Sequence, residues 1–369
     1  MRIVVTGGDG FLGRTLRLRL HEVGHREVAN LTRSTAASDW SEALAGADIV
    51  FHLAGVNRPP DPAEFVTGNA DLTAQVCHSL AAAGRGAALV LTSSTQVALD
   101  NAYGRSKLEA EHAVQCYSEN TGARACVLRL PNVFGKWARP HYNSAVATFC
   151  HNITRGLPMA VHDEVAPLRL VYVDDVVDAM LALLPPSTAS GTVEVAPVYE
   201  TTVGAVAATL REFADSRRTL VIPRVGAGLV RALYSTYVSY LPPDAFAYPL
   251  VRHEDPRGVF SEMLRTSDSG QFSYFTAYPG ITRGEHYHHT KTEKFLVVQG
   301  RARFAFRHVT TGESHSLDVE GTRPQVVEMV PGWAHNITNI GDGEMVVLLW
   351  ANEVFDPQRP DTIALKMSP

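Results

Sequence analysis

The chain opens with a short apolar strand that runs directly into a glycine-rich turn. Residues 3–6 are Ile-Val-Val-Thr, and Gly-Gly-Asp-Gly-Phe-Leu-Gly follows at 7–13. Glycines in this pattern allow a tight turn, close approach of a pyrophosphate to the backbone, and close packing of the next helix. The turn therefore predicts a β-α-β unit that binds a nucleotide through Gly7, Gly10, Phe11, Leu12 and Gly13.

The first half continues in this pattern. Up to about residue 187, short β-branched runs alternate with longer helical patterns, which is typical of repeated β-α-β units. We expect helices that begin near Phe11, Asn69 and Tyr103, and strands at 2–6, 27–32, 49–53, 89–93 and 125–130. The expected order is β-α-β-β-α-β-α-β, and the expected fold is an α/β Rossmann-type, doubly wound parallel sheet.

The second half has a different pattern. Short alternating strands at 294–299, 301–307 and 344–350 are separated by glycine and polar turns, which predicts a small all-β barrel. The adjacent Pro242 and Pro243 stop a preceding helix and suit a linker. We therefore expect two domains, residues 1–243 and residues 244–369.

Composition narrows the classes of partner. Lys plus Arg number 33 and Asp plus Glu number 38, so the formal net charge of −5 lacks the basic excess of a nucleic-acid binder. The four cysteines show no CxxC spacing, and the N-terminus lacks the apolar core of a signal peptide. No apolar run of about 20 residues is uninterrupted enough to span a membrane. We expect a cytoplasmic protein with neither nucleic acid nor membrane as a partner.

The end of the second expected strand bears on the choice of nucleotide. Leu-Thr-Arg-Ser at 31–34 has no acidic residue to bind the 2'-hydroxyl of an adenosine ribose. Arg33 could instead pair with a 2'-phosphate, which favours NADPH over NADH. The alternative is that Arg33 is an ordinary exposed cation.

A serine pair and a Tyr-x-x-x-Lys motif carry the catalytic signal. Ser93 and Ser94 lie at the end of an expected strand, and Tyr103 and Lys107 share one face of the next expected helix. A nearby ammonium favours the phenolate, so we expect Lys107 to lower the pKa of Tyr103 toward neutrality. A serine hydroxyl would polarise the reacting carbonyl or carbinol oxygen. The glycine turn, the serines and this motif together favour a catalytic role over a surface role.

These features resemble the short-chain dehydrogenase/reductase superfamily, in particular its extended type, which acts on nucleotide-sugars. The resemblance extends to Asp-Ile-Val-Phe-His-Leu-Ala-Gly at 48–55, Arg-Leu-Pro-Asn-Val-Phe-Gly at 129–135 and Val-Tyr-Val-Asp-Asp-Val at 171–176. It implies Ser94, rather than Ser93, as the polarising hydroxyl, with Tyr103 as the acid/base and Lys107 as its partner. It also implies that Leu53, Ala54, Gly55 and Asn69 contact the cofactor. Asn132 and His141 would face the substrate.

The second half carries residues that suit a metal. His286 and His288 are two apart, so strand alternation puts both on one face, and Glu293 and His335 can arrive from neighbouring strands. Three imidazoles and one carboxylate would complete a four-ligand shell for zinc or another divalent ion. His289 alternates away, and we expect it to be an ordinary polar side chain.

This spacing is similar to the two cupin motifs, which implies a jelly-roll barrel. Asp-Pro-Arg-Gly-Val-Phe-Ser-Glu at 255–262 and Arg-Gly-Glu-His at 283–286 also resemble the nucleotide-sugar 3,5-epimerase branch of the cupins. In that branch the histidine after Arg-Gly is a general base and no metal is needed. His286 therefore has two competing roles, metal ligand or base. Arg257 and Arg283 are candidates for binding the substrate's phosphates, because a guanidinium offers bidentate donors.

Both halves in one chain resemble a single family, the CapF-type bifunctional enzymes of capsular-polysaccharide synthesis. The resemblance implies that the cupin domain epimerises C3 of a UDP-2-acetamido-2,6-dideoxy-4-hexulose. The reductase domain then reduces the C4 ketone with NADPH to UDP-2-acetamido-2,6-dideoxy-L-talose, on the route to UDP-N-acetyl-L-fucosamine for surface polysaccharide. It also implies a homodimer formed through the cupin.

Two alternatives stay open. The chain could be an NADPH-dependent 4-ketosugar reductase alone, with the cupin a structural, metal-binding dimerisation module. It could also be a cofactor-sensing binding protein that no longer turns over. The intact Ser94, Tyr103 and Lys107 weigh against a sensor, which would not need all three.

Overall fold

The computed structural model describes residues 1–251, 253–255, 258–260, 264, 270–353 and 358–367. They divide into two compact units that interleave along the sequence. The first comprises Met1–Phe134, His141–Ser144 and Leu168–Thr201, and the second comprises Gly135–Pro140, Ala145–Pro167 and Thr202–Pro369. The expected boundary between residues 243 and 244 would give two continuous segments, whereas each of these units is built from several segments. The expected boundary stays a prediction.

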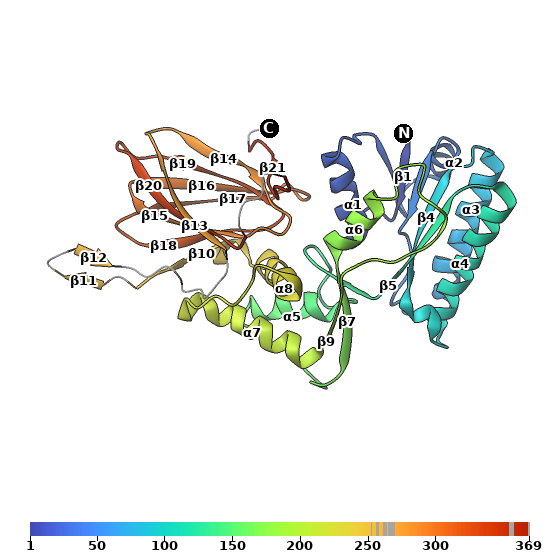
Figure 1. Cartoon of the computed structure of the whole chain (residues 1–369), viewed down its shortest axis with the longest axis horizontal. Coiled ribbons are helices and arrows are strands. Elements are labelled where there is room, and N and C mark those ends of the chain that lie inside the picture. The colour runs from blue at the N-terminus through green and yellow to red at the C-terminus, as the bar shows by residue number, and fades with distance from the viewer. Residues whose placement is uncertain (252, 256–257, 261–263, 265–269, 354–357, 368–369) are drawn as a thin grey trace. The chain divides into compact units, whose positions relative to one another are not determined.

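A parallel six-stranded sheet forms the centre of the first unit, in the order β2-β1-β3-β4-β5-β8. Figure 1 labels β1, β4 and β5 of this sheet. Its strands are β1 (Ile3–Thr6), β2 (Val28–Leu31), β3 (Ile49–His52), β4 (Ala88–Ser94), β5 (Ala125–Leu130) and β8 (Gly191–Val193). Because β1 lies between β2 and β3, the strand order reverses there. Open α/β sheets bind ligands at such a switch point, beyond the carboxyl ends of the strands. The predicted Rossmann-type fold is confirmed.

Helices cover both faces of this sheet. Ile3 and Val5 of β1 pack against α1 (Phe11–Glu22) and α6 (Val173–Leu181) on one face. The intervening Val4 belongs to the core on the other face. The helices on that side are α2 (Ala37–Ala45), α3 (Leu72–Ala83) and α4 (Ala102–Thr121). Successive side chains of β1 thus pack into two separate cores on opposite faces of the sheet, as a doubly wound sheet requires.

The structure departs from the expected helices at two points. Helix α2 was not expected; it is short, and its apolar face consists of Trp40, Ala43 and Leu44, which pack against the core. Helix α3 begins at Leu72 rather than near Asn69, because the π-helical turn η1 (Val66–Asp71) precedes it. Such turns are frequent at functional sites.

Two antiparallel five-stranded sheets dominate the second unit, and they confirm the predicted all-β fold. The first has the order β10-β18-β15-β20-β13, with β10 (Ala247–Pro249), β13 (Gln271–Ala277), β15 (Glu293–Gln299), β18 (Gln325–Met329) and β20 (Met345–Ala351). The second has the order β17-β16-β19-β14-β21, with β14 (Thr282–Tyr287), β16 (Arg301–His308), β17 (Ser314–Glu320), β19 (Trp333–Asn339) and β21 (Ile363–Ala364).

Three helices also belong to the second unit, namely α5 (Ala145–Ile153), α7 (Val203–Thr219) and α8 (Gly228–Ser239). The remaining strands form a sheet β6-β7-β9 and a hairpin β11-β12, with bounds Asn132–Phe134, Pro167–Tyr172, Val198–Thr202, His253–Asp255 and Gly258–Phe260. Short 3-10 turns are η2 (Thr95–Ala98) and η3 (Pro243–Ala245). Among the described residues, no helix has the length and apolarity that crossing a bilayer would require.

Candidate active site and metal centre

The glycine turn lies at the switch point of the parallel sheet. A Cβ at Gly7 would lie 2.8 Å from the backbone of Ala54, and one at Gly13 would lie 2.3 Å from the carbonyl oxygen of Gly7. Glycine is therefore required at both positions. Helix α1 begins at Phe11 with Gly10 as an N-cap that supplies no side chain, and its first turn has no acidic residue. Uncapped N–H groups at a helix start suit a phosphate.

The segment after β3 joins this turn to the catalytic helix. A Cβ at Gly55 would lie 2.8 Å from Oδ1 of Asn69 and 3.2 Å from Nζ of Lys107. Asn69 is buried; its Oδ1 accepts from Val56 N at 2.9 Å, and its Nδ2 donates to Val56 O and to Ser106 Oγ at 3.1 and 3.0 Å. Asn69 thus ties the loop after β3 to α4.

The predicted acid/base residues lie together at the end of β4 and the start of α4. Asn101 caps α4 by accepting a hydrogen bond from Gly104 N at 2.7 Å, which fixes the first turn of the helix around Tyr103. Tyr103 shares a side-chain hydrogen bond with Ser94. Lys107 is buried, and its Nζ donates to Thr92 O at 3.1 Å.

The ionisation of this group differs from one expectation. Burial raises the pKa of Tyr103, and the hydrogen bond with Ser94 opposes this rise. The expectation that Lys107 lowers the pKa of Tyr103 was therefore wrong. Burial lowers the pKa of Lys107 to about 8, against the opposing effect of Glu111. The expectation failed because it counted charge attraction and left out desolvation.

Glu111 is a residue of this site that sequence reasoning missed. It lies one helical turn beyond Lys107, is buried, and accepts a hydrogen bond from Ser93 Oγ. Arg129 of β5 binds it from Nε and Nη2, with a distance of 2.7 Å from Nη2 to Oε2. The spacing Tyr103, Lys107, Glu111 on one helix face was the signal that could have identified it. Ser93 is engaged by Glu111, whereas Ser94 faces Tyr103.

The outer predicted residues are exposed. Arg33 follows β2, and Asn132 on β6 donates from Nδ2 to Arg169 O at 3.3 Å. His141 has a left-handed backbone with φ of 55°. Its neighbour Tyr142 lies close enough to Tyr103 to raise the pKa of that phenol. The cofactor and substrate roles of Arg33, Asn132 and His141 stay predictions.

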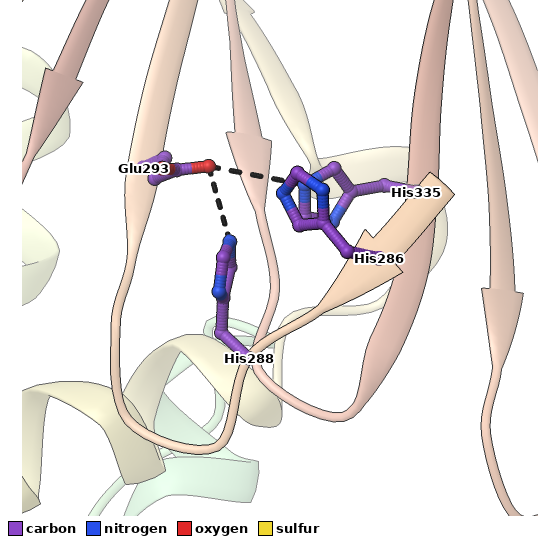
Figure 2. A group of neighbouring side chains, drawn as sticks. All are labelled: His286, His288, Glu293 and His335. Atoms are coloured by element: carbon purple, nitrogen blue, oxygen red, sulfur yellow. Dashed lines mark hydrogen bonds and ion pairs between the residues drawn. The ribbon is translucent and has the colours of Figure 1, made fainter. Parts of the chain in front are cut away.

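In the second unit, the four predicted metal ligands converge (Figure 2). One ligand atom from each of His286, His288, Glu293 and His335 lies within 4.8 Å of all the others. Glu293 Oε2 is 3.2 Å from Nε2 of His288 and 3.8 Å from Nε2 of His335. A β-bulge between Gly284 and His286 on β14 places His286 opposite His335 on β19.

The donor set fits a divalent cation. Burial and neighbouring charges lower the pKa of His286 and that of His335, so both rings are neutral donors, while the nearby His288 and Lys291 hold the pKa of Glu293 well below its usual range. Nε2 of His335 is buried with no hydrogen-bond partner, which leaves its lone pair for an ion. Three imidazole nitrogens and one carboxylate are a ligand set that zinc accepts.

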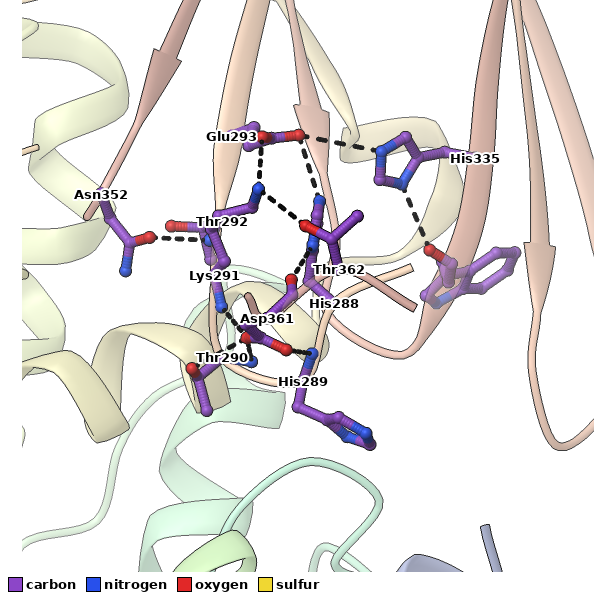
Figure 3. A network of polar contacts seen from close by, with 11 residues as sticks. His288, His289, Thr290, Lys291, Thr292, Glu293, His335, Asn352, Asp361 and Thr362 are labelled. Carbon is purple, nitrogen blue, oxygen red and sulfur yellow. Dashed lines mark hydrogen bonds and ion pairs between the residues drawn. The ribbon is translucent and has the colours of Figure 1, made fainter. Parts of the chain in front are cut away.

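A C-terminal segment that sequence reasoning missed holds the metal-ligand loop (Figure 3). Strand β21 pairs with β14, and the carboxylate of Asp361 accepts from the backbone N–H groups of His289, Thr290 and Lys291 at 2.8, 2.6 and 2.7 Å. The carbonyl of Asp361 accepts from Nδ1 of His288, which directs Nε2 into the cluster. Some 70 residues separate the partners, so no local pattern reveals the contact.

The other predicted residues of this half lie outside the cluster. His289 is buried beside Tyr287, with ring centroids 5.6 Å apart, as expected for a polar side chain that is not a ligand. Arg283 is exposed; its guanidinium lies over Phe275 and donates to Thr276 O at 3.2 Å. Arg257 lies outside the described residues.

Comparisons with known proteins agree with this architecture. Residues 3–196 match the model of the NAD dependent epimerase/dehydratase family, and residues 253–363 match the polysaccharide biosynthesis C-terminal domain. The chain is 51% identical over 365 residues to the UDP-2-acetamido-2,6-beta-L-arabino-hexul-4-ose reductase of Pseudomonas aeruginosa, with 99% of this chain and 98% of that protein covered.

Solved structures show the same two-part architecture. The capsular polysaccharide assembling protein CapF of Staphylococcus aureus is 41% identical, with a TM-score of 0.68 and complete coverage of both chains. A UDP-glucuronic acid 4-epimerase of Bacillus cereus, solved with UDP-glucuronic acid and NAD, covers 65% of this chain and 99% of its own at a TM-score of 0.54. At 17% identity, that likeness shows the fold alone.

Proposed function

This chain belongs to the NAD dependent epimerase/dehydratase family and, within it, to the CapF-like nucleotide-sugar 4-keto reductases of polysaccharide biosynthesis, and from this premise we propose a two-step reaction on one UDP-sugar. The second unit epimerises C3 of a UDP-2-acetamido-2,6-dideoxy-4-hexulose. The first unit then reduces the C4 ketone to UDP-2-acetamido-2,6-dideoxy-L-talose. The product would lead to UDP-N-acetyl-L-fucosamine.

One observation carries the reductase proposal. Lys107 Nζ adjoins Gly55, and the neighbouring Ala54 adjoins Gly7 of the glycine turn that suits a pyrophosphate. Tyr103, which pairs with Ser94, lies one helical turn before Lys107 on α4. The residues that would hold NADPH are Gly7, Gly10, Phe11, Leu12, Gly13, Arg33, Leu53, Ala54, Gly55 and Asn69. NADPH, when bound, supplies the hydride. Arg33 is the residue that would favour it over NADH.

The chain's own residues would manage the proton. Ser94 Oγ holds the ketone oxygen, and Tyr103 Oη donates its proton to the oxygen as charge develops there. A phenol with a raised pKa is protonated at neutral pH, which is the form a reduction needs. Lys107, with a pKa of about 8, keeps a positive charge beside the cofactor loop at neutral pH. Asn132 and His141 would contact the sugar.

For the epimerase, His286 is the candidate general base. A proton beside a ketone is acidic enough for an imidazole base when a cation stabilises the enolate. The lowered pKa of His286 keeps the ring neutral at pH 7, as a base must be. Arg257 and Arg283 would bind the phosphates of the UDP group.

A second candidate is a 4-ketosugar reductase whose cupin is a structural, metal-binding module. The position of His286 favours it, because its ring centroid lies 4.9 and 4.8 Å from those of His288 and His335. A histidine that ligates a metal is not available to take a proton from C3. A divalent cation, zinc for example, would supply a fixed positive charge at His286, His288, Glu293 and His335.

Proton NMR in D2O distinguishes the two functions. The protein is mixed with the UDP-4-keto-6-deoxy-N-acetylhexosamine, and deuterium at C3 and the fate of C4 are followed before and after addition of NADPH. Deuterium at C3 before NADPH, and C4 reduction after it, would support both activities. Reduction without deuterium would leave the reductase alone, and no change in either would contradict both.

A further inference from the structure

A buried histidine that the proposed reaction does not use lies at the end of β3, directly before the loop that contains Ala54 and Gly55. His52, the last residue of β3, exposes none of its surface. Its Nδ1 is 2.7 Å from Thr6 Oγ1, at the end of β1, and its Nε2 is 3.0 Å from Thr73 Oγ1, in the first turn of α3. Both ring nitrogens are therefore hydrogen-bonded inside the protein.

The neighbouring donors fix the direction of these bonds. Thr73 Oγ1 donates its one hydrogen to Asn69 O at 2.7 Å, so toward His52 it can only accept. Nε2 of His52 consequently carries the hydrogen, and Nδ1 accepts from Thr6 Oγ1. Thr6 Oγ1 in turn accepts from Ala54 N at 3.2 Å. The result is one neutral tautomer in a directed chain of hydrogen bonds.

The two ends of this chain reach the two parts of the reductase site. At one end, Thr6 Oγ1 holds the N–H of Ala54, and the backbone of Ala54 is what a Cβ at Gly7 would meet, so the glycine turn lies against the loop after β3 there. At the other end, Asn69 donates to Ser106 Oγ, which donates to Tyr103 O at 2.9 Å. The ring of His52 thus connects the glycine turn with the first turn of α4, which carries Tyr103.

We propose that His52 is a positioning residue of the reductase site, which sets the glycine turn through Nδ1 and the Tyr103 turn through Nε2. This inference rests on the reductase function proposed above. Burial lowers the pKa of His52 to about 3, which keeps the ring neutral and the direction of the chain unchanged across the pH range of activity.

Two substitutions of His52 test its two hydrogen bonds separately. An asparagine places its side-chain amide near the position of Nδ1, and a glutamine places its amide near that of Nε2. His52→Asn should keep the bond to Thr6 and lose the one to Thr73, so kcat of ketone reduction falls about tenfold while the NADPH Kd is retained. His52→Gln should keep kcat and raise the Kd about tenfold. The Kd is measured by NADPH fluorescence.

The exposed His78 of α3 supplies matched controls, because His78→Asn and His78→Gln make the same changes away from the site. Equal effects of the two His52 variants on kcat and Kd, or no effect of either, would overturn the proposal. If the variants do not fold, 15N NMR of the wild-type protein with labelled histidine identifies which ring nitrogen of His52 carries the hydrogen. A neutral His52 with hydrogen on Nε2 is the expected result, and hydrogen on Nδ1 would refute it. A wild type that binds NADPH and reduces no 4-ketosugar would contradict the proposed function instead.

Discussion

The buried ammonium of Lys107 gives the reductase a pH dependence. Burial lowers its pKa from 10.5 to about 8, so the unfolded chain binds more protons than the folded one between these values. This group therefore makes the free energy of unfolding rise with pH over that range. Activity should move the other way, because the charged form is lost above pH 8. We expect kcat of ketone reduction to decline as pH rises through about 8.

A variant of Glu111 tests that assignment. Glu111 raises the pKa of Lys107, so Glu111→Gln should move the decline of the pH–rate profile to lower pH. Glu119 is exposed on the same helix, and Glu119→Gln should leave the profile in place. A decline at the same pH in both variants would show that another group titrates.

Tyr103 allows the two reactions to be separated within one protein. Removing the hydroxyl in Tyr103→Phe removes the proton donor, and general-acid catalysis contributes about 10²- to 10⁴-fold. We expect NADPH oxidation to fall by that factor, while deuterium exchange at C3 continues at the wild-type rate in the NMR experiment. An unchanged rate of NADPH oxidation would exclude Tyr103 as the acid.

At the scale of elements, the loop from His288 to Glu293 is held from two directions. Asp361 and Thr362 of the C-terminal segment bind it on one side, where Lys291 Nζ is 3.2 Å from Thr362 Oγ1. On the other side, Ser235 of α8 donates to Thr290 O at 2.6 Å, and Arg231 donates to Thr290 Oγ1. A loop fixed by side chains from two other elements presents its metal ligands in a defined geometry.

This arrangement predicts a metal defect in Asp361→Asn. The amide offers one acceptor oxygen where the carboxylate offers two, and its N–H groups face backbone N–H groups, so the loop loosens. Zinc affinity should fall about 10- to 100-fold in chelator competition. Asp318, which pairs with Arg303 on the surface of the same unit, provides the control Asp318→Asn. Equal zinc affinity in the Asp361 and Asp318 variants would rule out this positioning role.

The elements also show what a sequence can reveal. Strands β1 to β5 were predictable because each is a short, largely apolar run, and the Ser94, Tyr103 and Lys107 set because its spacing is local. The convergence of the four candidate metal ligands was predictable from strand alternation together with the cupin resemblance. Helix α2 was missed because it is only nine residues long, with three apolar residues on its core face. The contacts of Asp361 join segments far apart in the chain, so they depend on tertiary packing, which no local pattern encodes.

For the whole molecule, the family resemblance predicts association of two chains. The cupin was expected to mediate a homodimer, so the mass in solution should be twice the 40.1 kDa of one chain. Light scattering coupled to size-exclusion chromatography measures it directly. A mass of one chain over the concentration range of the activity assay would contradict the expectation.

The second unit begins before residue 244 and includes helix α7. Arg217 of α7 is half-buried and forms an ion pair with the buried Glu328 of β18, which also pairs with the buried Lys294 of β15. The Arg217 guanidinium lies 4.5 Å from the centroid of the Tyr248 ring. A fragment cut at the predicted boundary, 244–369, lacks α7 and leaves these groups without Arg217. Glu328 keeps Lys294 as a partner, so the loss of stability should be smaller than the about 3–5 kcal/mol that an unpaired buried charge costs.

We therefore expect the fragment 202–369, which retains α7 and α8, to unfold at higher urea concentration than the fragment 244–369. Segments 135–140 and 145–167 are absent from both fragments, so the difference reports on residues 202–243 alone. Arg217→Met in the longer fragment should remove much of the difference, because it removes the cation and keeps the length of the side chain. Equal stability of the two fragments would instead support 243/244 as the limit of an independent barrel, with α7 and α8 stabilised by the remainder of the chain.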